Sequence, residues 1–326
     1  MRLHESDIMI YQKTIKNNIS TKGMGLHSGR DISVSLKTAP AGHGIKFKRS
    51  DLVSAPVIAA LPENVTSTTL ATTIGHGENR ISTVEHLMAA LASMGVDNIL
   101  VETDGPELPV FDGSAAEWVA LLIKAGLRKQ DKPRRAFKVT RPFKVNVGDK
   151  SIEVRPASRF SVEAHIDFGG AIGRHCFYYV ESDQAFIKEI SRSRTFCMLK
   201  DVEMMHSKGL ALGGSLENAV VVGDDGILNP DGLRFDDEFV RHKILDFIGD
   251  LAMAGAPVVG QFVLHKPGHE LNRHFLTEAM AQPGLMELSL DGAAQSSQQR
   301  ASSKNARLLS RLSLPFDEAL APAASL

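Results

Sequence analysis

The sequence predicts an α+β protein with two similar domains, each a β-sheet layered against helices. Three observations lead to this fold class. Each half of the chain begins with several strand-like segments. Each half continues with a helix that carries a histidine, a glycine that ends the helix, and another strand. The 326 residues suffice for two domains with cores of their own. The repeated order indicates an internal duplication, so a site at the domain junction would collect ligands from both halves.

The composition excludes several classes of protein. Apolar residues make up 43% of the chain and charged residues 23%, with a formal net charge of −1. This balance is typical of a globular protein without nucleic-acid binding. Cys176 and Cys197 lack the spacing of a metal-binding pair and suit a reducing cytoplasm. The N-terminus is too polar for a signal peptide, and the apolar run 251–264 is too interrupted to span a membrane.

The first half begins with predicted strands. Residues 8–19 read as a strand, and Ile32, Val34 and Leu36 alternate as in a half-buried strand. Between them lies the glycine-rich segment 23–29, which lacks the residue order of a phosphate-binding loop and is predicted to be a hairpin connection. Residues 66–74 are rich in β-branched side chains and predict one further strand.

The helix of the first half is predicted to open at Ser82 and to stop at Gly95. Two interpretations of Glu85 compete at its start. Ser82 and Glu85 have the spacing of a capping box, in which the carboxylate only stabilises the helix end. In the other interpretation Glu85 lies beside a metal-activated water and His86 binds the metal.

Domain boundaries follow from composition. The charged segment 129–135, which contains a proline, predicts an interdomain linker. The expected domains are therefore 1–130, with the His86 helix, and 136–285, with the helix described next. Residues 286–326 are expected to form a flexible tail, since much of this segment lacks periodicity. Packing of the tail end on the body and a degradation tag are both open interpretations.

The helix of the second half, predicted over 235–255, carries the clearest metal signal. His242, Asp246 and Asp250 follow one another at intervals of four and therefore share one face. An imidazole and a carboxylate so placed can bind one cation, and the pairing suits zinc. An amphipathic surface helix has the same pattern, because a polar face lies opposite an apolar stripe. That stripe consists of Val240, Ile244, Phe247, Ile248 and Leu251.

Three protein ligands with one open position are typical of a catalytic zinc site. His86, His242 and Asp246 supply that number, and Glu85 would serve as the base for a water whose pKa the metal lowers toward about 7. The chain contains no HExxH segment, so the arrangement differs from that of the metalloproteases with this motif.

Taken together, the motifs resemble those of the UDP-3-O-acyl-N-acetylglucosamine deacetylases of Gram-negative lipid A biosynthesis. The motifs are GMGLHSG (23–29), ISTVEHLMAAL (81–91), DGSA (112–115), SRSRTF (191–196), LGGS (212–215), DGLRFDDEFVRHKILDFIGDL (231–251) and KPGH (266–269). They occur in the family's order over residues 8–285. The resemblance implies one zinc ion per chain at the domain junction, with iron as the alternative metal in the cell. It assigns the metal to His86, His242 and Asp246, and the general base to Glu85.

The resemblance implies further catalytic roles. Thr195 would help the metal to polarise the acetamide carbonyl and to stabilise the tetrahedral oxyanion. Lys243 would add positive charge near the site. His269, oriented by Asp250, would stabilise the oxyanion as a cation and protonate the leaving amine.

A substrate follows from the same resemblance: a UDP-glucosamine with an N-acetyl group and a hydroxyacyl chain. Asp167 and Phe168 match the family's uracil-binding edge, and Lys150 and Lys266 match lysines near its nucleotide. Without the family these four read as a strand end and solvated turn lysines. The acyl passage is matched by Leu26, Leu199, Val202, Ala211 and Leu216. Cys197 departs from the family, which carries glycine there.

Two alternatives remain open. One is a zinc amidase for a different amide, such as a peptide. The other is a non-enzymatic binding protein, because sheet-and-helix layers of this kind also occur in RNA-binding proteins. For the leading hypothesis we expect a monomer in the cytoplasm of a Gram-negative bacterium, with a small-molecule substrate.

Overall fold

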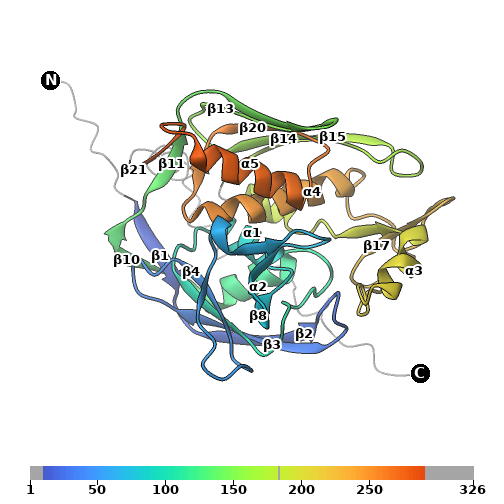
Figure 1. Cartoon of the computed structure of the whole chain (residues 1–326), viewed down its shortest axis with the longest axis horizontal. Coiled ribbons are helices and arrows are strands. Elements are labelled where there is room, and N and C mark those ends of the chain that lie inside the picture. Colours follow the sequence, from blue (N-terminus) through green and yellow to red (C-terminus); the bar gives the residue numbers. More distant parts are fainter. Residues whose placement is uncertain (1–9, 183, 291–326) are drawn as a thin grey trace, which may run out of the picture.

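The protein is a three-layer assembly in which helices lie between two sheets (Figure 1). The computed structural model describes residues 10–182 and 184–290. One sheet lies at the top of the view and the other at the bottom, with α1, α2, α4 and α5 between them. The predicted α+β class is confirmed.

The first sheet is five-stranded and has the order β2-β3-β9-β4-β5. Its strands are β2 (Ile19–Met24), β3 (Asp31–Thr38), β9 (Ile99–Thr103), β4 (Ile45–Arg49) and β5 (Ile58–Ala59). The alternating residues Ile32, Val34 and Leu36 are buried, as predicted from their period of two. They join one apolar core with residues of α1 (Glu85–Met94) and α2 (Ala116–Ala125).

The second sheet repeats the first. Its order is β12-β13-β20-β14-β15, with β12 (Phe143–Val147), β13 (Lys150–Arg155), β20 (Gln261–His265), β14 (Ser161–Asp167) and β15 (Arg174–Val180). In both sheets the third and fourth strands in this order are parallel and all other neighbours are antiparallel. Helices α4 (Glu238–Leu251) and α5 (His269–Ala281) cover the second sheet. The internal duplication predicted from the element order is therefore present in the topology.

The remaining described strands form four smaller sheets. They are β1 (Tyr11–Ile15) with β10 (Leu127–Pro133); β6 (Val65–Ser67), β7 (Thr73–His76) and β8 (Asn79–Ile81); β11 (Ala136–Val139), β19 (Val258–Val259) and β21 (Met286–Ser289); and β16 (Phe196–Met198), β17 (Val220–Gly223) and β18 (Gly226–Ile227). Helix α3 (Leu199–Ser207), the short helices Pro62–Asn64 and Ala252–Ala254, and one π-helical turn (Phe186–Ile190) complete the structure.

Four stretches differ from the sequence expectation. The described part of residues 8–19, expected as one strand, is divided between β1, which ends at Ile15, and β2, which begins at Ile19. The charged segment 129–135, expected as a linker, lies mostly in β10 and pairs with β1. Residues 66–74, expected as one strand, are divided between β6 and β7, because Leu70 takes a left-handed φ of 61° that a strand cannot contain. Residues 286–289, expected in the tail, form β21 and pair with β11. The tail from residue 291 onward lies outside the described residues.

The two halves meet where α1 crosses α4. A Cβ atom on Gly249 would lie 2.1 Å from the carbonyl oxygen of Glu85, so only glycine permits this approach. The contact buries both faces of α4, including His242, Asp246 and Asp250. The alternative of a surface helix is therefore wrong, since the polar face of α4 turns toward the other half of the molecule. Within the described residues, no helix has the length and apolar character needed to cross a membrane.

Candidate metal centre

Three predicted metal ligands converge at the crossing of α1 and α4. His86 comes from the first turn of α1, and His242 and Asp246 lie one turn apart on α4. Their ligand atoms all lie within 4.8 Å of one another, and all three residues are buried. The Oδ1 atom of Asp246 lies 3.3 Å from Nε2 of His242 and 3.7 Å from Nε2 of His86.

The donor atoms fit a metal ion. Among the described residues, the buried Oδ1 of Asp246 has no hydrogen-bond partner, which would be costly without a cation. The Nδ1 atom of His242 donates to the carbonyl oxygen of Ser193 at 2.9 Å, so its Nε2 lone pair is left for a ligand. Two imidazoles and a carboxylate are ligands that zinc and iron both accept.

The protonation states also fit a metal. Burial lowers the pKa of His242 to about 4, so its imidazole is neutral at pH 7. Burial raises the pKa of Asp246, but the nearby His242 and Lys243 outweigh this effect, and the net pKa lies well below its usual range. A neutral imidazole and an ionised carboxylate are the forms that bind metals.

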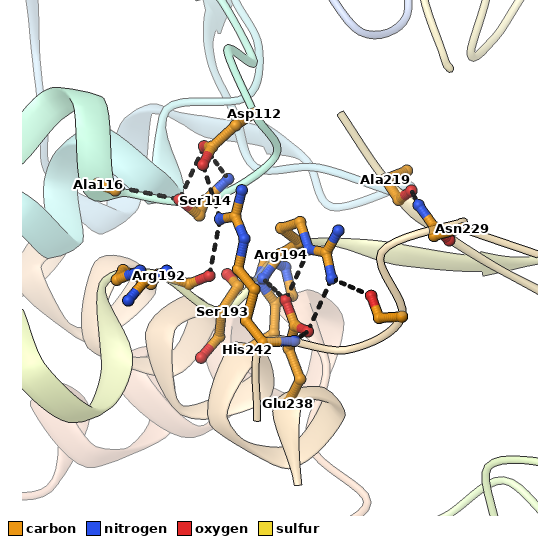
Figure 2. Close-up of polar contacts among 12 residues, drawn as sticks. Asp112, Ser114, Ala116, Arg192, Ser193, Arg194, Ala219, Asn229, Glu238 and His242 are labelled. Atoms are coloured by element: carbon orange, nitrogen blue, oxygen red, sulfur yellow. Dashed lines mark hydrogen bonds and ion pairs between the residues drawn. The ribbon is translucent and has the colours of Figure 1, made fainter. Parts of the chain in front are cut away.

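A buried ion pair holds the loop that orients His242 (Figure 2). The guanidinium of Arg194 donates to both carboxylate oxygens of Glu238, at 2.9 and 3.0 Å, and Glu238 also accepts the backbone N–H of Arg194. These bonds fix the 191–195 loop on the first turn of α4. The carbonyl of Ser193 is thereby fixed as the acceptor for His242.

A second ion pair ties this loop to the first half of the chain. Arg234 donates to the Asp112 carboxylate at 2.7 Å and to the carbonyl of Arg192 at 3.0 Å. Asp112 belongs to the predicted DGSA motif, and its Oδ1 also accepts the hydroxyl of Ser114. Figure 2 shows Asp112 and Ser114 beside the Arg192–Arg194 segment, so the motif serves to join the halves.

Glu85 does not form the capping box. Its Oε2 atom accepts the backbone N–H of Thr72 at 3.0 Å, and the hydroxyl of Ser82 is bonded to Thr73 instead. Val84 is the N-cap residue of α1 and Thr83 before it has a left-handed φ of 56°, so Ser82 does not occupy the cap position. The other oxygen of Glu85 lies 3.7 Å from Nε2 of His269. Burial raises the pKa of Glu85 and so makes its carboxylate a stronger base.

His269 stands opposite Glu85 at the start of α5. Its Nδ1 atom lies 2.8 Å from Oδ2 of Asp250, and its Nε2 atom points toward Glu85 and lies 4.0 Å from Asp246. Burial lowers the pKa of His269, but the carboxylates of Asp250 and Asp246 outweigh it and raise the pKa to about 10. This direction of the pKa favours the charged ring at pH 7.

Lys243 lies on α4, and Thr195 lies at the end of the 191–195 loop. The ammonium of Lys243 is 2.8 Å from Oδ2 of Asp246 and lies over the ring of Phe196, 5.3 Å from its centroid. Thr195 follows the 191–194 segment, and its backbone N–H donates to the carbonyl of Gly113 at 2.8 Å. Both residues are thus held beside the loop that orients His242.

The four predicted nucleotide-binding residues gather at one end of the second sheet. Lys150 begins β13, Lys266 follows β20 and Asp167 ends β14, and these three strands are neighbours. Lys266 is 2.6 Å from a carboxylate oxygen of Asp149, an exposed ion pair of little energetic weight. Phe168 is half exposed, which leaves its ring face open to a ligand.

The apolar residues predicted for the acyl passage lie in two adjoining segments. Leu26 belongs to the glycine-rich turn, and its carbonyl accepts the N–H of Gly213 at 3.0 Å. This bond docks the 211–214 segment on the turn. Of the other predicted residues, Leu199 and Val202 lie in α3, Ala211 begins the 211–214 segment, and Leu216 follows it. Leu199 and Leu216 are exposed.

Some residues of the site escaped the sequence analysis. Thr72 and Asn272 donate to the Asp250 carboxylate, and Ser193 orients His242. Glu107 is buried and accepts two backbone N–H groups of the glycine-rich turn, besides the hydroxyl of Thr83. None of these residues could be found from a regular spacing in the sequence, because each forms its hydrogen bond with a residue distant in sequence.

A cavity of about 200 Å³ lies elsewhere, at the far ends of α1 and α4. Its lining includes Ile45, Leu61, Phe160 and Leu251, and none of the predicted site residues. The candidate site lies at the metal donors and not at this cavity, because the ionisable groups with perturbed pKa values converge around the metal donors.

A buried donor set suited to one metal ion, next to the carboxylate of Glu85 and the imidazole of His269, is the arrangement expected of a metal-dependent hydrolase. The family model described as UDP-3-O-acyl N-acetylglycosamine deacetylase matches residues 12–281. The chain belongs to this family.

Curated relatives agree over most of their length. A UDP-3-O-acyl-N-acetylglucosamine deacetylase of Myxococcus xanthus is 48% identical over 278 residues, 85% of this chain and 88% of the relative. Its counterpart in Geobacter sp. (strain M21) is 48% identical over 276 residues, 84% and 90% of the two chains. The Shewanella pealeana enzyme of the same name is 45% identical over 284 residues, 86% and 93%.

Proposed function

We propose that this protein removes the N-acetyl group from UDP-3-O-acyl-N-acetylglucosamine, a step of lipid A biosynthesis, with zinc as its resident metal. The observation that carries the proposal is the buried Oδ1 of Asp246, which has no hydrogen-bond partner among the described residues and lies between two histidines, beside Glu85 and His269. Membership in the family supplies the substrate. Iron would be bound by the same donors.

A zinc ion held by His86, His242 and Asp246 would supply Lewis acidity, activating water and polarising the amide carbonyl. The side chain of Glu85 accepts the proton of the attacking water. Its buried surroundings favour this role, because burial raises the pKa of the carboxyl group. The backbone N–H of Thr72 holds one carboxylate oxygen, so the other faces the reacting centre.

His269 acts on the other side of the reacting carbon. As a cation it stabilises the negative charge that develops on the carbonyl oxygen, and Lys243 and Thr195 contribute to the same charge stabilisation. As the carbon–nitrogen bond breaks, His269 gives its Nε2 proton to the leaving amine, and acetate departs. Asp250 keeps the ring in place through Nδ1.

The substrate would extend from this centre in two directions. The nucleotide lies at the sheet end with Lys150, Asp167, Phe168 and Lys266, where a lysine pair meets the diphosphate and the Phe168 ring stacks on uracil. The hydroxyacyl chain lies along Leu26 and the segment from α3 to Leu216. Cys197, on β16 beside α3, lies next to this region.

The test is acetate release from UDP-3-O-(3-hydroxyacyl)-N-acetylglucosamine by the purified protein, before chelation, after chelation and after zinc is restored. We expect acetate release before chelation, loss of this activity after chelation, and its recovery when zinc is restored. Folded, zinc-loaded protein without activity on this substrate would refute the proposed function, and simple amides and peptides would then test the zinc amidase alternative.

The proposed function also places the protein in the cytoplasm, where nucleotide sugars are made, and it requires no partner subunit because all the proposed groups come from one chain. Sedimentation of the purified protein is expected to give a monomer.

A further inference from the structure

Thr72 lies where the three helices that carry Glu85, Asp250 and His269 meet. It is 2% exposed and precedes β7 in the segment that the sequence predicted as plain strand. Its backbone N–H donates to Oε2 of Glu85 on α1 at 3.0 Å. Its hydroxyl donates to Oδ1 of Asp250 on α4 at 2.6 Å and lies 3.3 Å from Nδ1 of His269. One residue therefore contacts all three groups.

The Thr72 hydroxyl determines how the Asp250 carboxylate is oriented. Oδ2 of Asp250 is bonded to Nδ1 of His269 and to the amide of Asn272, both at 2.8 Å, and Oδ1 receives the hydroxyl. The carboxylate plane is thus fixed from both oxygens. With the hydroxyl removed, Oδ1 would lose the only hydrogen bond that it has among the described residues, and the carboxylate could rotate about its Cβ–Cγ bond.

The backbone of Thr72 is tied to the other helix. Its carbonyl accepts the N–H of Val84, the residue before α1, at 3.4 Å, and Leu70 takes a left-handed φ of 61° two residues earlier. The segment is therefore anchored on α1 while its side chain reaches α4. Such a link sets the position of His269 relative to Glu85. The nearest atoms of these two side chains, Nε2 of His269 and Oε1 of Glu85, are 3.7 Å apart.

We propose that Thr72 is a positioning residue of the reaction, whose hydroxyl and amide hold Asp250 with His269, and Glu85, in one arrangement across the junction of the two halves. This inference rests on the proposed deacetylase function. Thr72 itself touches no reacting atom, so its effect is expected in the rate of the chemical step and not in substrate binding.

The test compares three variants with the wild-type protein. Thr72→Val keeps the shape but removes the hydroxyl, and kcat is expected to fall about 10- to 100-fold with KM unchanged within about twofold, the scale of one hydrogen bond to a charged group. Thr72→Ser restores the hydroxyl and is expected to keep kcat within about threefold. Thr73→Val is the matched control, because its hydroxyl bonds Ser82 instead, and its kcat is expected to be unchanged.

A coupling measurement separates positioning from simple scaffolding. In an Asp250→Asn background, Thr72→Val is expected to lower kcat by less than about twofold more, because the hydroxyl acts through that carboxylate. Bound zinc and thermal midpoint are measured for every variant, and the zinc content is expected to stay at the wild-type value.

The outcomes are distinct. If the wild-type protein has no activity, the proposed function fails before Thr72 is in question. If the wild type is active and Thr72→Val keeps kcat within about twofold, the inference on Thr72 is overturned. It is also overturned if valine and serine lower kcat equally, or if the losses from Thr72→Val and Asp250→Asn multiply in full. If Thr72→Val does not fold, Thr72→Cys, with a weak thiol donor, replaces it and is expected to lose part of kcat; an unchanged kcat would overturn the inference.

Discussion

Glu85 and His269 show how single residues acquire opposite roles from their surroundings. Burial raises the pKa of the Glu85 carboxyl group, so its ionised form is a stronger base than an exposed glutamate. For His269 the burial effect is outweighed by Asp250 and Asp246, and a pKa of about 10 keeps the ring charged. In the proposed mechanism the pair would thus supply a base and an acid at one pH, and their nearest atoms are 3.7 Å apart.

At this scale we predict that Glu85→Gln lowers kcat by about 10²- to 10⁴-fold, the usual contribution of a general base. The amide can still accept the N–H of Thr72, so fold and zinc content are expected to persist. Steady-state kinetics, metal analysis and thermal unfolding check the three statements. Glu270→Gln, an exposed carboxylate beside His269, is the control and is expected to keep wild-type kcat. A Glu85→Gln enzyme with normal turnover would remove Glu85 from the mechanism.

At the scale of elements, the crossing of α1 and α4 depends on Gly249. Helix propensity alone predicts that Gly249→Ala stabilises the protein by about 1 kcal/mol. The geometry predicts the opposite, because the new Cβ would lie 2.1 Å from the Glu85 carbonyl oxygen and the helices must separate. We expect destabilisation of about 1–3 kcal/mol in urea unfolding, together with reduced activity, since His86 and His242 would move apart. A stabilised variant would show that the helices adjust freely.

The Arg194–Glu238 pair joins the 191–195 loop to α4, and both side chains are buried. Burial raises the pKa of Glu238, but the hydrogen bonds of Arg194 outweigh it and the net pKa is lowered. A carboxyl group with a lowered folded-state pKa stabilises the fold at pH values above its unfolded pKa, near 4.5, and this contribution is lost as the pH falls through the folded value.

We therefore predict that Glu238→Gln costs about 3 kcal/mol at pH 7, because it leaves a buried guanidinium unpaired. The difference from wild type is expected to shrink when unfolding is measured below pH 4.5. Glu153→Gln, which breaks the more exposed pair with Arg155, is the control and should cost at most about 1 kcal/mol. An equal effect of the two variants would contradict a special role for the buried pair.

At the scale of the whole molecule, the metal donors bridge the two duplicated halves. His86 belongs to the first half, and His242 and Asp246 belong to the second. A bound ion would therefore tie the halves together in addition to the ion pair between Asp112 and Arg234.

We predict that chelation lowers the thermal midpoint and that zinc restores it, since a ligand of the folded state at 100 times its Kd adds about 2.7 kcal/mol of stability. Calorimetry with and without stoichiometric zinc measures the shift. In His242→Ala the shift is expected to vanish, whereas the exposed His274→Ala should behave as wild type. The proposed metal centre would be refuted by a His242→Ala protein that binds zinc as tightly as wild type.

The periodicity of the sequence was enough to predict much of the fold, and it was enough to predict the part of the site that lies on α4. The strand alternation at Ile32, Val34 and Leu36, and the stripe opposite His242 and Asp246 on α4, are local properties that survive folding. The spacing of His242 and Asp246 likewise determines that they share a helix face, because the helix geometry is the same in any context.

Only the tertiary structure excluded the capping box for Glu85 and a solvent-exposed position for the polar face of α4. The spacing of Ser82 and Glu85 fits a capping box. In the structure, however, Thr83 has a left-handed φ, and Oε2 of Glu85 accepts the backbone N–H of Thr72 at the junction of the two halves.

By itself the sequence determined the helix faces, the duplicated order of elements and the face that His242 and Asp246 share, because these depend on residue type and on neighbours within one or two turns. The tertiary structure decided what those faces meet. His86 reaches His242 only because Gly249 lets two helices touch, and Thr72 reaches Asp250 only because the chain folds back over 178 residues of sequence separation. Contacts of that range depend on the packing of both sheets, and no local pattern encodes them.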